Sequence, residues 1–397
     1  LMSEIIDQLK VEMYTRFGIQ PSDVQIVRSP YRICPLGAHI DHQLGPVTAM
    51  AIDQAVYLAF APSGDSQMRL QSLTFDGNVQ FDLNAVPDKQ ESDWGNYPRG
   101  AVRALQEQGH ALTQGIVGLS AGKMNEGGLS SSAAIGVAFL LALEQANNIN
   151  VTPEENIRLD QAIENGYLGL KNGILDQAAI LLSRKNHLTL IDCESITHKL
   201  IPKSRAMPPF DILVAQSGVK EALVGTGYNT RVDECAQAAG LLLNAVGRPD
   251  QKPLLGNITQ QEYNTHQDKL SGDIAKRAKH FFSESARVQK GVEAWQSGDL
   301  AVFGRLISES GYSSVHNYEC GSEPLIDLYH ILIETDGVYG ARFSGAGFRG
   351  CSIALVDPSK SAAALEYIQN QYQQKHPQLA KNASSFTCQP DDGAHIQ

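Results

Sequence analysis

The sequence is short of charged and aromatic side chains, which make up 19% and 7% of its 397 residues. Basic residues are the scarcer sign, with 32 Lys and Arg against 43 Asp and Glu, so the formal net charge is −11. Proteins that bind nucleic acid or anionic lipid owe much of their affinity to clustered Lys and Arg. The charge balance therefore argues against both kinds of partner. It does not exclude a small anionic ligand, because local charges decide such binding.

Long apolar runs and paired cysteines are also missing. The longest apolar run, Ala133 to Leu143, is shorter than the roughly 20 residues that a bilayer requires. No charged and then apolar leader opens the chain, so we expect no secretory signal. The six cysteines form no CxxC pair, which argues against a zinc or dithiol site. We expect reduced thiols in a cytoplasmic protein.

What the sequence does contain predicts two α+β domains. The chain exceeds the roughly 250–300 residues at which single cores stop growing. A basic, proline-containing break between Pro202 and Pro209 puts the boundary near residue 203, with domains at 1–203 and 204–397. Periodicity predicts helices over 3–17, 94–108, 130–147, 153–169, 229–245, 267–296, 300–311, 323–334 and 361–374. Strands are predicted over 24–27, 47–60, 69–72, 79–83, 116–120, 210–216, 338–343 and 351–356.

A glycine- and serine-rich cluster directly precedes the apolar helix predicted from residue 130. Glycines let backbone amides approach a ligand, and a helix N-terminus adds free N–H groups and partial positive charge. That combination favours a phosphate site over an ordinary helix cap. It is not a Walker loop, because no GxxxxGK[ST] occurs. The candidate phosphate-binding residues are Gly127, Gly128, Leu129, Ser130, Ser131, Ser132 and Ala133.

A second cluster, residues 344–350, matches GxGxxG literally. A dinucleotide-binding fingerprint must join a strand to a helix, whereas here the glycines join two predicted strands. A dinucleotide site is therefore rejected. A tight hairpin and an active-site wall that includes Gly345 and Gly347 both stay open.

The third cluster, residues 31–42, places Arg32, His39, Asp41 and His42 after a strand. These side chains suit a polyhydroxylated ligand. A metal held by His39, Asp41 and His42 is a weaker interpretation, since no further His or Cys cluster completes it, and a solvated polar loop is the plain alternative.

In this order, the clusters resemble the galactokinase-like branch of the GHMP kinase superfamily over nearly the whole chain. The signature stretch keeps Arg32, Gly37, His39, Asp41 and Gly45, and both glycine loops match. Shorter matching segments are 94–97, 172–177, 228–231 and 340–342. The resemblance implies a two-domain GHMP kinase fold with the active site in the cleft between the domains.

The resemblance also implies a reaction, in which ATP phosphorylates the anomeric hydroxyl of a sugar. It makes Asp176 the catalytic carboxylate, with Arg32 beside it. Ser132 and Glu164 match magnesium-coordinating positions, which suits the preference of Mg²⁺ for oxygen. The remaining implied contacts are His39, Asp41, Gly173 and Tyr228 for the sugar and Trp94, with Tyr97, for the nucleotide. We expect a monomer or weak homo-oligomer.

One departure from the family carries the substrate inference. Galactokinases have a glutamate where this chain has Ala38. A glutamate facing a carboxylate on carbon 6 would cost roughly 1–4 kcal/mol at 4 Å. The surrounding pattern resembles galacturonokinases, so galacturonate is the expected substrate. Galactose, arabinose or a catalytically silent sugar sensor are the alternatives.

Other polar side chains have no settled role. The residue that pairs with the carboxylate stays open among Tyr228, His42 and Arg99. Arg342 either borders the active site or is a surface charge. We interpret the remaining polar residues, which have helical spacing, as a structural stripe: His280, Glu284 and Arg287.

Overall fold

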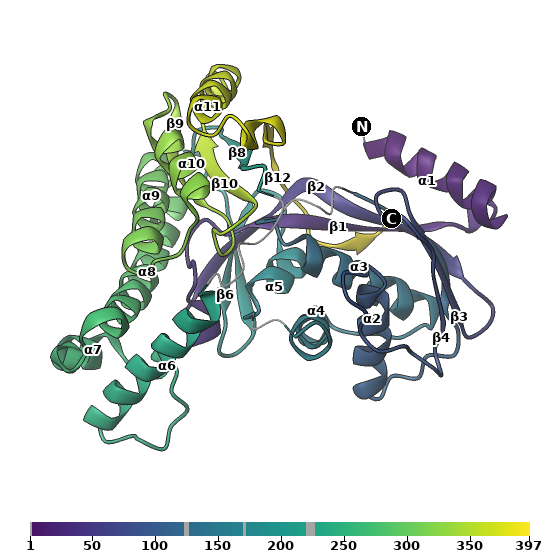
Figure 1. The fold of residues 1–397 in the computed structure, drawn as a ribbon, viewed down its shortest axis with the longest axis horizontal. Coiled ribbons are helices and arrows are strands. Elements are labelled where there is room, and N and C mark those ends of the chain that lie inside the picture. Colours follow the sequence, from purple (N-terminus) through teal and green to yellow (C-terminus); the bar gives the residue numbers. More distant parts are fainter. Residues whose placement is uncertain (1, 123–126, 170–171, 220–226) are drawn as a thin grey trace.

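The computed structural model describes residues 2–122, 127–169, 172–219 and 227–397. Its larger sheet runs in the order β13-β1-β2-β5-β3-β4, with β6, β7 and β12 attached to it (Figure 1). The strands of this sheet are β1 (Gln25–Ile33), β2 (Val47–Pro62), β3 (Gln67–Ser72), β4 (Val79–Asp82), β5 (Ile116–Ala121), β6 (His187–Asp192), β7 (Thr197–Pro202), β12 (Pro390–Asp391) and β13 (His395–Ile396).

Helices cover both faces of the larger sheet because its central strands are apolar on both sides. Helix α1 (Met2–Phe17) buries Leu9 and Met13 against one face. The other face carries α2 (Asn96–Glu107), α3 (Ser131–Ala146), α4 (Pro153–Gln161) and α5 (Leu175–Leu182). Helix α3 is buried nearly all round, as its apolar sequence predicts, and its N-terminus begins at the glycine- and serine-rich cluster.

A smaller sheet of order β11-β8-β10-β9 forms the second half of the molecule. Its strands are β8 (Asp211–Gln216), β9 (Val338–Phe343), β10 (Cys351–Val356) and β11 (Ser384–Cys388). The helices here are α6 (Tyr228–Ala245), α7 (Gln260–His266), α8 (Gly272–Ser297), α9 (Leu300–His316), α10 (Glu323–Glu334) and α11 (Ser361–Lys375).

The last residues of the chain leave the smaller sheet and return to the larger one. Strand β12 pairs with β2, and β13 pairs with β1. Residues 390–397 therefore lie against the first half of the chain, although they follow the predicted boundary by almost 190 positions. The boundary at residue 203 itself stays a prediction.

Most predicted elements are confirmed, and α10, β9 and β10 have the predicted bounds. The strand predicted over 24–27 is longer, and the helix predicted over 153–169 gives way to a π-helical turn, Ala162–Tyr167. The sequence analysis missed α5, α7, β6, β7 and β11 to β13. All six cysteines are buried and none forms a disulfide, as predicted. No helix within the described residues is both long and apolar enough to span a bilayer.

Candidate active site

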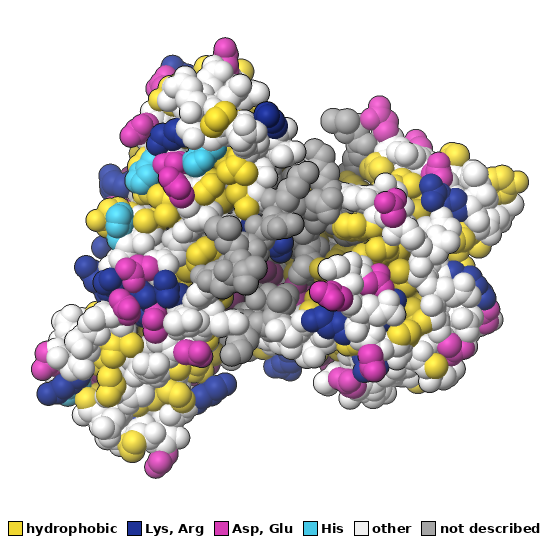
Figure 2. Space-filling model, viewed as in Figure 1, with side chains coloured by type: hydrophobic (Ala, Val, Ile, Leu, Met, Phe, Trp, Pro, Cys, Tyr) yellow, Lys and Arg dark blue, Asp and Glu magenta, His cyan; other side chains and the backbone are white. Residues whose placement is uncertain are grey.

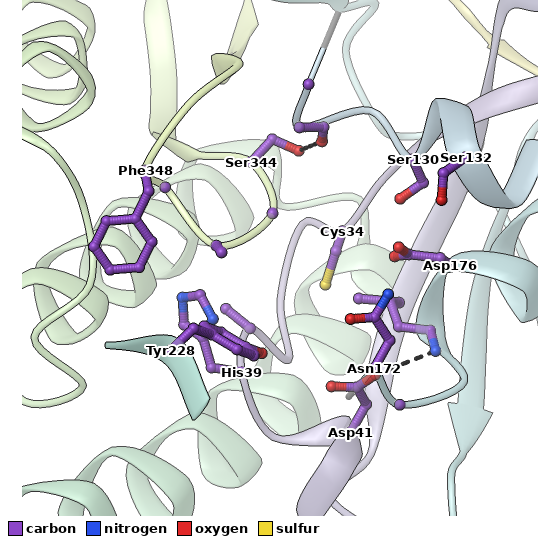
Figure 3. A pocket seen from close by; sticks show the side chains of 18 of the residues that line it. Cys34, His39, Asp41, Ser130, Ser132, Asn172, Asp176, Tyr228, Ser344 and Phe348 are labelled. Atoms are coloured by element: carbon purple, nitrogen blue, oxygen red, sulfur yellow. Dashed lines mark hydrogen bonds between the residues drawn. The ribbon is translucent and has the colours of Figure 1, made fainter. Parts of the chain in front are cut away.

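A cavity of about 450 Å³ lies where the two halves of the molecule meet (Figure 3). Its walls come from the loop after β1, the start of α3, the segment before α5, the start of α6 and the β9–β10 loop. Residues predicted for the site that line it are Arg32, Ala38, His39, Asp41, Gly127, Gly128, Ser130, Ser131, Ser132, Gly173, Asp176, Tyr228, Gly345 and Gly347. The structure thus brings together segments more than 300 positions apart in the chain.

Arg32 and Asp176 form an ion pair at the centre of this cavity. The pairing of β1 with β2 shifts register between Pro30 and Arg32, and such a bulge redirects the following side chain. The Nε and Nη2 atoms of Arg32 lie 2.8 and 2.7 Å from Oδ1 of Asp176. Burial alone would lower the pKa of Arg32, but Asp176 outweighs it and the pKa is raised. The arginine therefore stays a cation inside the protein.

The start of α3 is open to a ligand. Ser130 precedes the helix in the left-handed region, with φ of 59°, and its side chain makes no capping hydrogen bond. Its buried Oγ has no partner among the described residues. A non-glycine residue held at positive φ with an unpaired hydroxyl is typical of functional loops. Of the other candidates, Leu129 and Ala133 are buried in the core and do not line the cavity.

The two glycine loops pack backbone to backbone. A side chain on Gly350 would collide with the backbone of Gly127, and one on Gly345 would come within 3.4 Å of Gly128. Ser344 donates a hydrogen bond to the carbonyl of Gly128, which also accepts one from Arg32 at 2.9 Å. Strands β9 and β10 are antiparallel neighbours, which confirms that the literal GxGxxG is no dinucleotide fingerprint. This hairpin loop is also a wall of the cavity.

Ser132 and Glu164 lie together at the edge of the cavity. Glu164 sits in the π-helical turn after α4 and accepts hydrogen bonds from the Ser132 hydroxyl and, at 2.9 Å, from Asn172. Burial and the nearby Asp176 raise the pKa of Glu164. A cation would relieve this accumulation of negative charge. No group of three His, Cys, Asp or Glu side chains in the described ranges could hold a metal alone, so phosphate oxygens would have to complete such a site.

His39 and Asp41 line the opposite end of the cavity from the phosphate loop. His39 stacks on Tyr318 at 4.6 Å between ring centroids, and its buried Nε2 has no partner in the described part of the chain. Burial, followed by His280 and Arg342, holds the pKa of His39 well below its usual range, so the ring is neutral. Asp41 accepts a hydrogen bond from the Leu175 amide at 3.3 Å. A side chain on Gly173 would collide with Asp41, so this glycine leaves room for the carboxylate.

The predicted polar stripe on α8 is structural and holds the loop that carries Ala38. Glu284 accepts hydrogen bonds from the amides of Gly37 and Ala38 at 2.8 and 3.2 Å. His280 bonds the carbonyl of Ala38 at 2.8 Å. Burial alone would raise the pKa of Glu284, but Arg287, His280 and Arg342 lower it to about 2. The carboxylate of Glu284 is thus charged, and both of its oxygens have hydrogen-bond partners within the protein.

Three predictions about single residues change with the structure. Arg342 is 2% exposed and lines the cavity, so the surface interpretation is wrong. Arg99 pairs with Asp93 at 2.8 Å, and His42 bonds the Tyr318 hydroxyl at 3.0 Å. Neither Arg99 nor His42 lines the cavity.

Trp94 lines a different pocket, of about 410 Å³, together with Tyr97. Burial raises the pKa of Tyr97, and the side chain of Ser132, at the start of α3, opposes that rise, which places Tyr97 near Ser132. The sequence analysis assigned no role to Cys34, Asn172 and Arg349, which line the main cavity. Only their positions inside the three clusters and the 172–177 segment pointed to them.

Comparison with known protein families gives the class of this chain. Residues 96–184 match the GHMP kinases N terminal domain, residues 291–374 match the GHMP kinases C terminal domain, and residues 14–62 match the galactokinase galactose-binding signature. The chain belongs to the GHMP kinase family.

Its relatives refine that class. The chain is 48% identical to a galacturonokinase of Arabidopsis thaliana, over 98% of each sequence. It is 31% identical to a galactokinase of Roseiflexus sp., over 97% of this chain and 96% of that one. The crystal structure of Lactococcus lactis galactokinase complexed with galactose superposes with a TM-score of 0.90 at 28% identity, covering 98% of this chain and 99% of that chain.

Proposed function

We propose that this sugar kinase transfers the γ-phosphoryl group of ATP to the anomeric hydroxyl of D-galacturonate, giving galacturonate 1-phosphate and ADP. The similarity to the galacturonokinase supports the activity. The observation that carries the substrate is Ala38, which lines the cavity with a methyl group where galactokinases have a carboxylate. The absence of disulfides among the six cysteines fits a cytoplasmic location, which we also propose.

Asp176 and Arg32 would act on the reacting atoms. The oxygen of the anomeric hydroxyl attacks the γ-phosphorus, the bond from that phosphorus to the bridging β-phosphate oxygen breaks so that ADP leaves, and the proton of the hydroxyl passes to Asp176. Arg32 would stabilise negative charge on the transferring group and, through the ion pair, hold the carboxylate of Asp176 in position. Phosphoryl transfer of this kind depends mainly on positioning and charge stabilisation.

The start of α3 would hold the phosphates. Uncapped amides and the hydroxyls of Ser130 and Ser131 face the cavity. Ser132 and Glu164 would hold Mg²⁺, which supplies positive charge to the β- and γ-phosphates when bound. The pocket beside Trp94 and Tyr97 would take the adenine ring, since aromatic walls suit a flat base.

At the sugar end, His39, Asp41 and Tyr228 would bind ring hydroxyls. A neutral imidazole both donates and accepts hydrogen bonds, and the unpartnered Nε2 of His39 is available for one. Asp41, when ionised, can accept hydrogen bonds but cannot donate them. Together they distinguish the hydroxyl pattern of the ring but not the group on carbon 6.

Galactose phosphorylation is the second candidate, which the galactokinase relatives support. A silent sugar sensor is less well supported, since the ion pair of Arg32 and Asp176 and the phosphate loop are both present.

Product analysis tests the proposal. With ATP, Mg²⁺ and galacturonate, phosphorus NMR should show a phosphate coupled to the anomeric proton, and Asp176→Asn should lower kcat by at least about 100-fold while still binding ATP. A product phosphorylated elsewhere on the sugar would refute the reaction. Unchanged turnover in Asp176→Asn would remove Asp176 from its role.

A further inference from the structure

Arg342 is a buried cation in the cavity, and no carboxylate of the described residues forms an ion pair with it. Within the described residues, its guanidinium donates to the carbonyl of Phe343 at 3.1 Å and to the Ser310 hydroxyl at 3.4 Å. No carboxylate there lies within ion-pair distance of it, and its Nη2 has no hydrogen-bond partner. A buried guanidinium that is only partly paired is costly unless a ligand completes its shell.

Arg342 lies next to the loop that carries Ala38. Ser310, its partner, also donates to Glu284 at 2.6 Å, and Glu284 holds the amide of Ala38. Ala38 and Arg342 both line the cavity. Ala38, where galactokinases have a glutamate, is therefore linked to Arg342 through the hydrogen-bonded side chains of Glu284 and Ser310.

We propose that Arg342, which belongs to a segment shared with galactokinases, is left free by the missing glutamate at Ala38 to bind the carbon-6 carboxylate of the sugar acid, so that Ala38 and Arg342 together set the preference for galacturonate over galactose. This inference rests on the proposed function and adds the residue that reads the acid. A carboxylate can accept from two guanidinium nitrogens at once, whereas the hydroxymethyl group of galactose is neutral and offers one oxygen.

The charges around Arg342 fit this role. Burial lowers the pKa of Arg342, and Arg32 and Arg287 lower it further, against the opposing effects of Cys34 and Glu284. Glu284 is already paired with Arg287 at 2.7 Å and bonded by two amides. The local charge therefore favours one more anion, which a substrate carboxylate would supply.

The other cations are less suitable. Arg32 is engaged with Asp176. Arg349 lies against Gly127, at the phosphate loop. Arg99 lies outside the cavity, in an ion pair with Asp93.

A substrate-and-variant cycle tests the proposal. The kcat/KM values for galacturonate, its neutral methyl ester and galactose are compared in wild type and Arg342→Met. In wild type, the ester should react about 100-fold less efficiently than the acid. Arg342→Met should lower the value for the acid by about the same factor and bring acid and ester to within a few-fold of each other. Arg342→Lys, which keeps the charge but loses the fork, should give an intermediate loss.

The outcomes separate this inference from the proposed function. A wild type that does not prefer galacturonate overturns the proposed function itself. If wild type prefers the acid and Arg342→Met lowers all three substrates equally, Arg342 is structural and the inference is wrong. Arg99→Met, the loss of another buried arginine, should leave the ratio of acid to ester as it is. If Arg342→Met does not fold, Arg342→Lys and the ester comparison decide: an unchanged ratio in Arg342→Lys would contradict the proposal.

Discussion

At the scale of single residues, the proposed substrate preference depends on the short side chain of Ala38 and on the positive charge of Arg342. The methyl group of Ala38 removes bulk and negative charge from the wall of the cavity, while Arg342 keeps an unused donor close by. His280 and Glu284 hydrogen-bond the carbonyl and the amide of Ala38 and so fix its backbone. The pocket is thus shaped by residues on α8 that do not touch the ligand.

Restoring the glutamate should shift selectivity toward galactose. In Ala38→Glu, the new carboxylate would face the substrate's carboxylate, at a cost of roughly 1–4 kcal/mol at 4 Å, and compete for Arg342. The ratio of kcat/KM for galacturonate to that for galactose should fall by about tenfold or more. Ala38→Gln, of equal size but neutral, is the control: if it lowers the ratio as much, bulk rather than charge explains the preference.

His280 should make folding stability depend on pH. Burial lowers its pKa to about 4 from an ordinary value of 6.5, against the opposing effect of Glu284. Below pH 6.5 the unfolded chain takes up a proton that the folded chain refuses, so stability is full above that pH and falls until about pH 4, by about 3 kcal/mol in total. His280→Gln should show a smaller fall between pH 7 and 5 in urea unfolding. An identical fall in both proteins would exclude this histidine as the cause.

The predictability of these residues varied with their surroundings. That His39, Asp41 and Asp176 line one cavity was predictable because each lies in a short motif, whereas their roles stay predictions. The role of Arg342 was left open, since only the folded chain reveals that it is buried and that no carboxylate in the described ranges pairs with it. Arg99, by contrast, is a poor candidate because Asp93 already pairs with it. The sequence alone did not reveal this ion pair, although the two residues are close along the chain.

At the scale of elements, α3 and α4 pack through a glycine that leaves room for a buried carboxylate. Gly136 of α3 faces Asp160 of α4, whose two side-chain oxygens are buried without a partner among the described residues. Burial, and then Glu164 and Asp176, hold the pKa of Asp160 well above its usual range. The α3–α4 contact therefore tolerates little change.

Replacing a helical glycine by alanine should lower folding stability at Gly136 and raise it at Gly240. Gly136→Ala should destabilise the protein by about 1–3 kcal/mol, because the new Cβ would overlap Asp160. Gly240→Ala on α6, where no atom lies within 4 Å of the new Cβ, should stabilise by about 0.4–1 kcal/mol. Equal effects at both positions, measured by urea unfolding, would show that helix propensity rather than packing decides.

Elements with a clear period were predictable, and those that depend on tertiary contacts were not. Strands β9 and β10 each begin directly after a glycine and are mostly apolar, and their bounds were predicted correctly. Strand β7 is mostly exposed, so it has no apolar period, and β12 and β13 are two residues each. The π-helical turn that carries Glu164 continues the apolar pattern of α4, which conceals the change of geometry.

At the scale of the whole molecule, the C-terminal segment ties the two sheets together. After β11 in the smaller sheet, Asp391 pairs with Arg28 of β1 at 2.9 Å, and this arginine is 2% exposed. Asp391→Ala leaves that buried charge without its carboxylate, with only the carbonyls of Ile52 and Asp392 to accept from it, and should destabilise the protein by about 3 kcal/mol. Asp88→Ala, which breaks an exposed pair with Arg103, should cost less than about 1 kcal/mol. Similar midpoints in urea for both variants would contradict this role for the segment.

The protein and its proposed substrates are both negatively charged, so the binding of these substrates depends on where the positive charges lie. Charged side chains of both signs are scattered over the visible face (Figure 2), whereas the cavity gathers Arg32, Arg342 and Arg349. A net charge of −11 slows the approach of anions slightly. Binding of two anionic substrates then depends on these few cations and on the amides at the start of α3.

The substrate preference of the unmodified chain tests the central claim most directly. With saturating ATP and Mg²⁺, a coupled assay of ADP release gives kcat/KM for galacturonate and for galactose. A cavity with Ala38 and a free donor on Arg342 predicts a preference for galacturonate of about 100-fold, equivalent to about 2.7 kcal/mol. Equal or faster turnover of galactose would contradict the account.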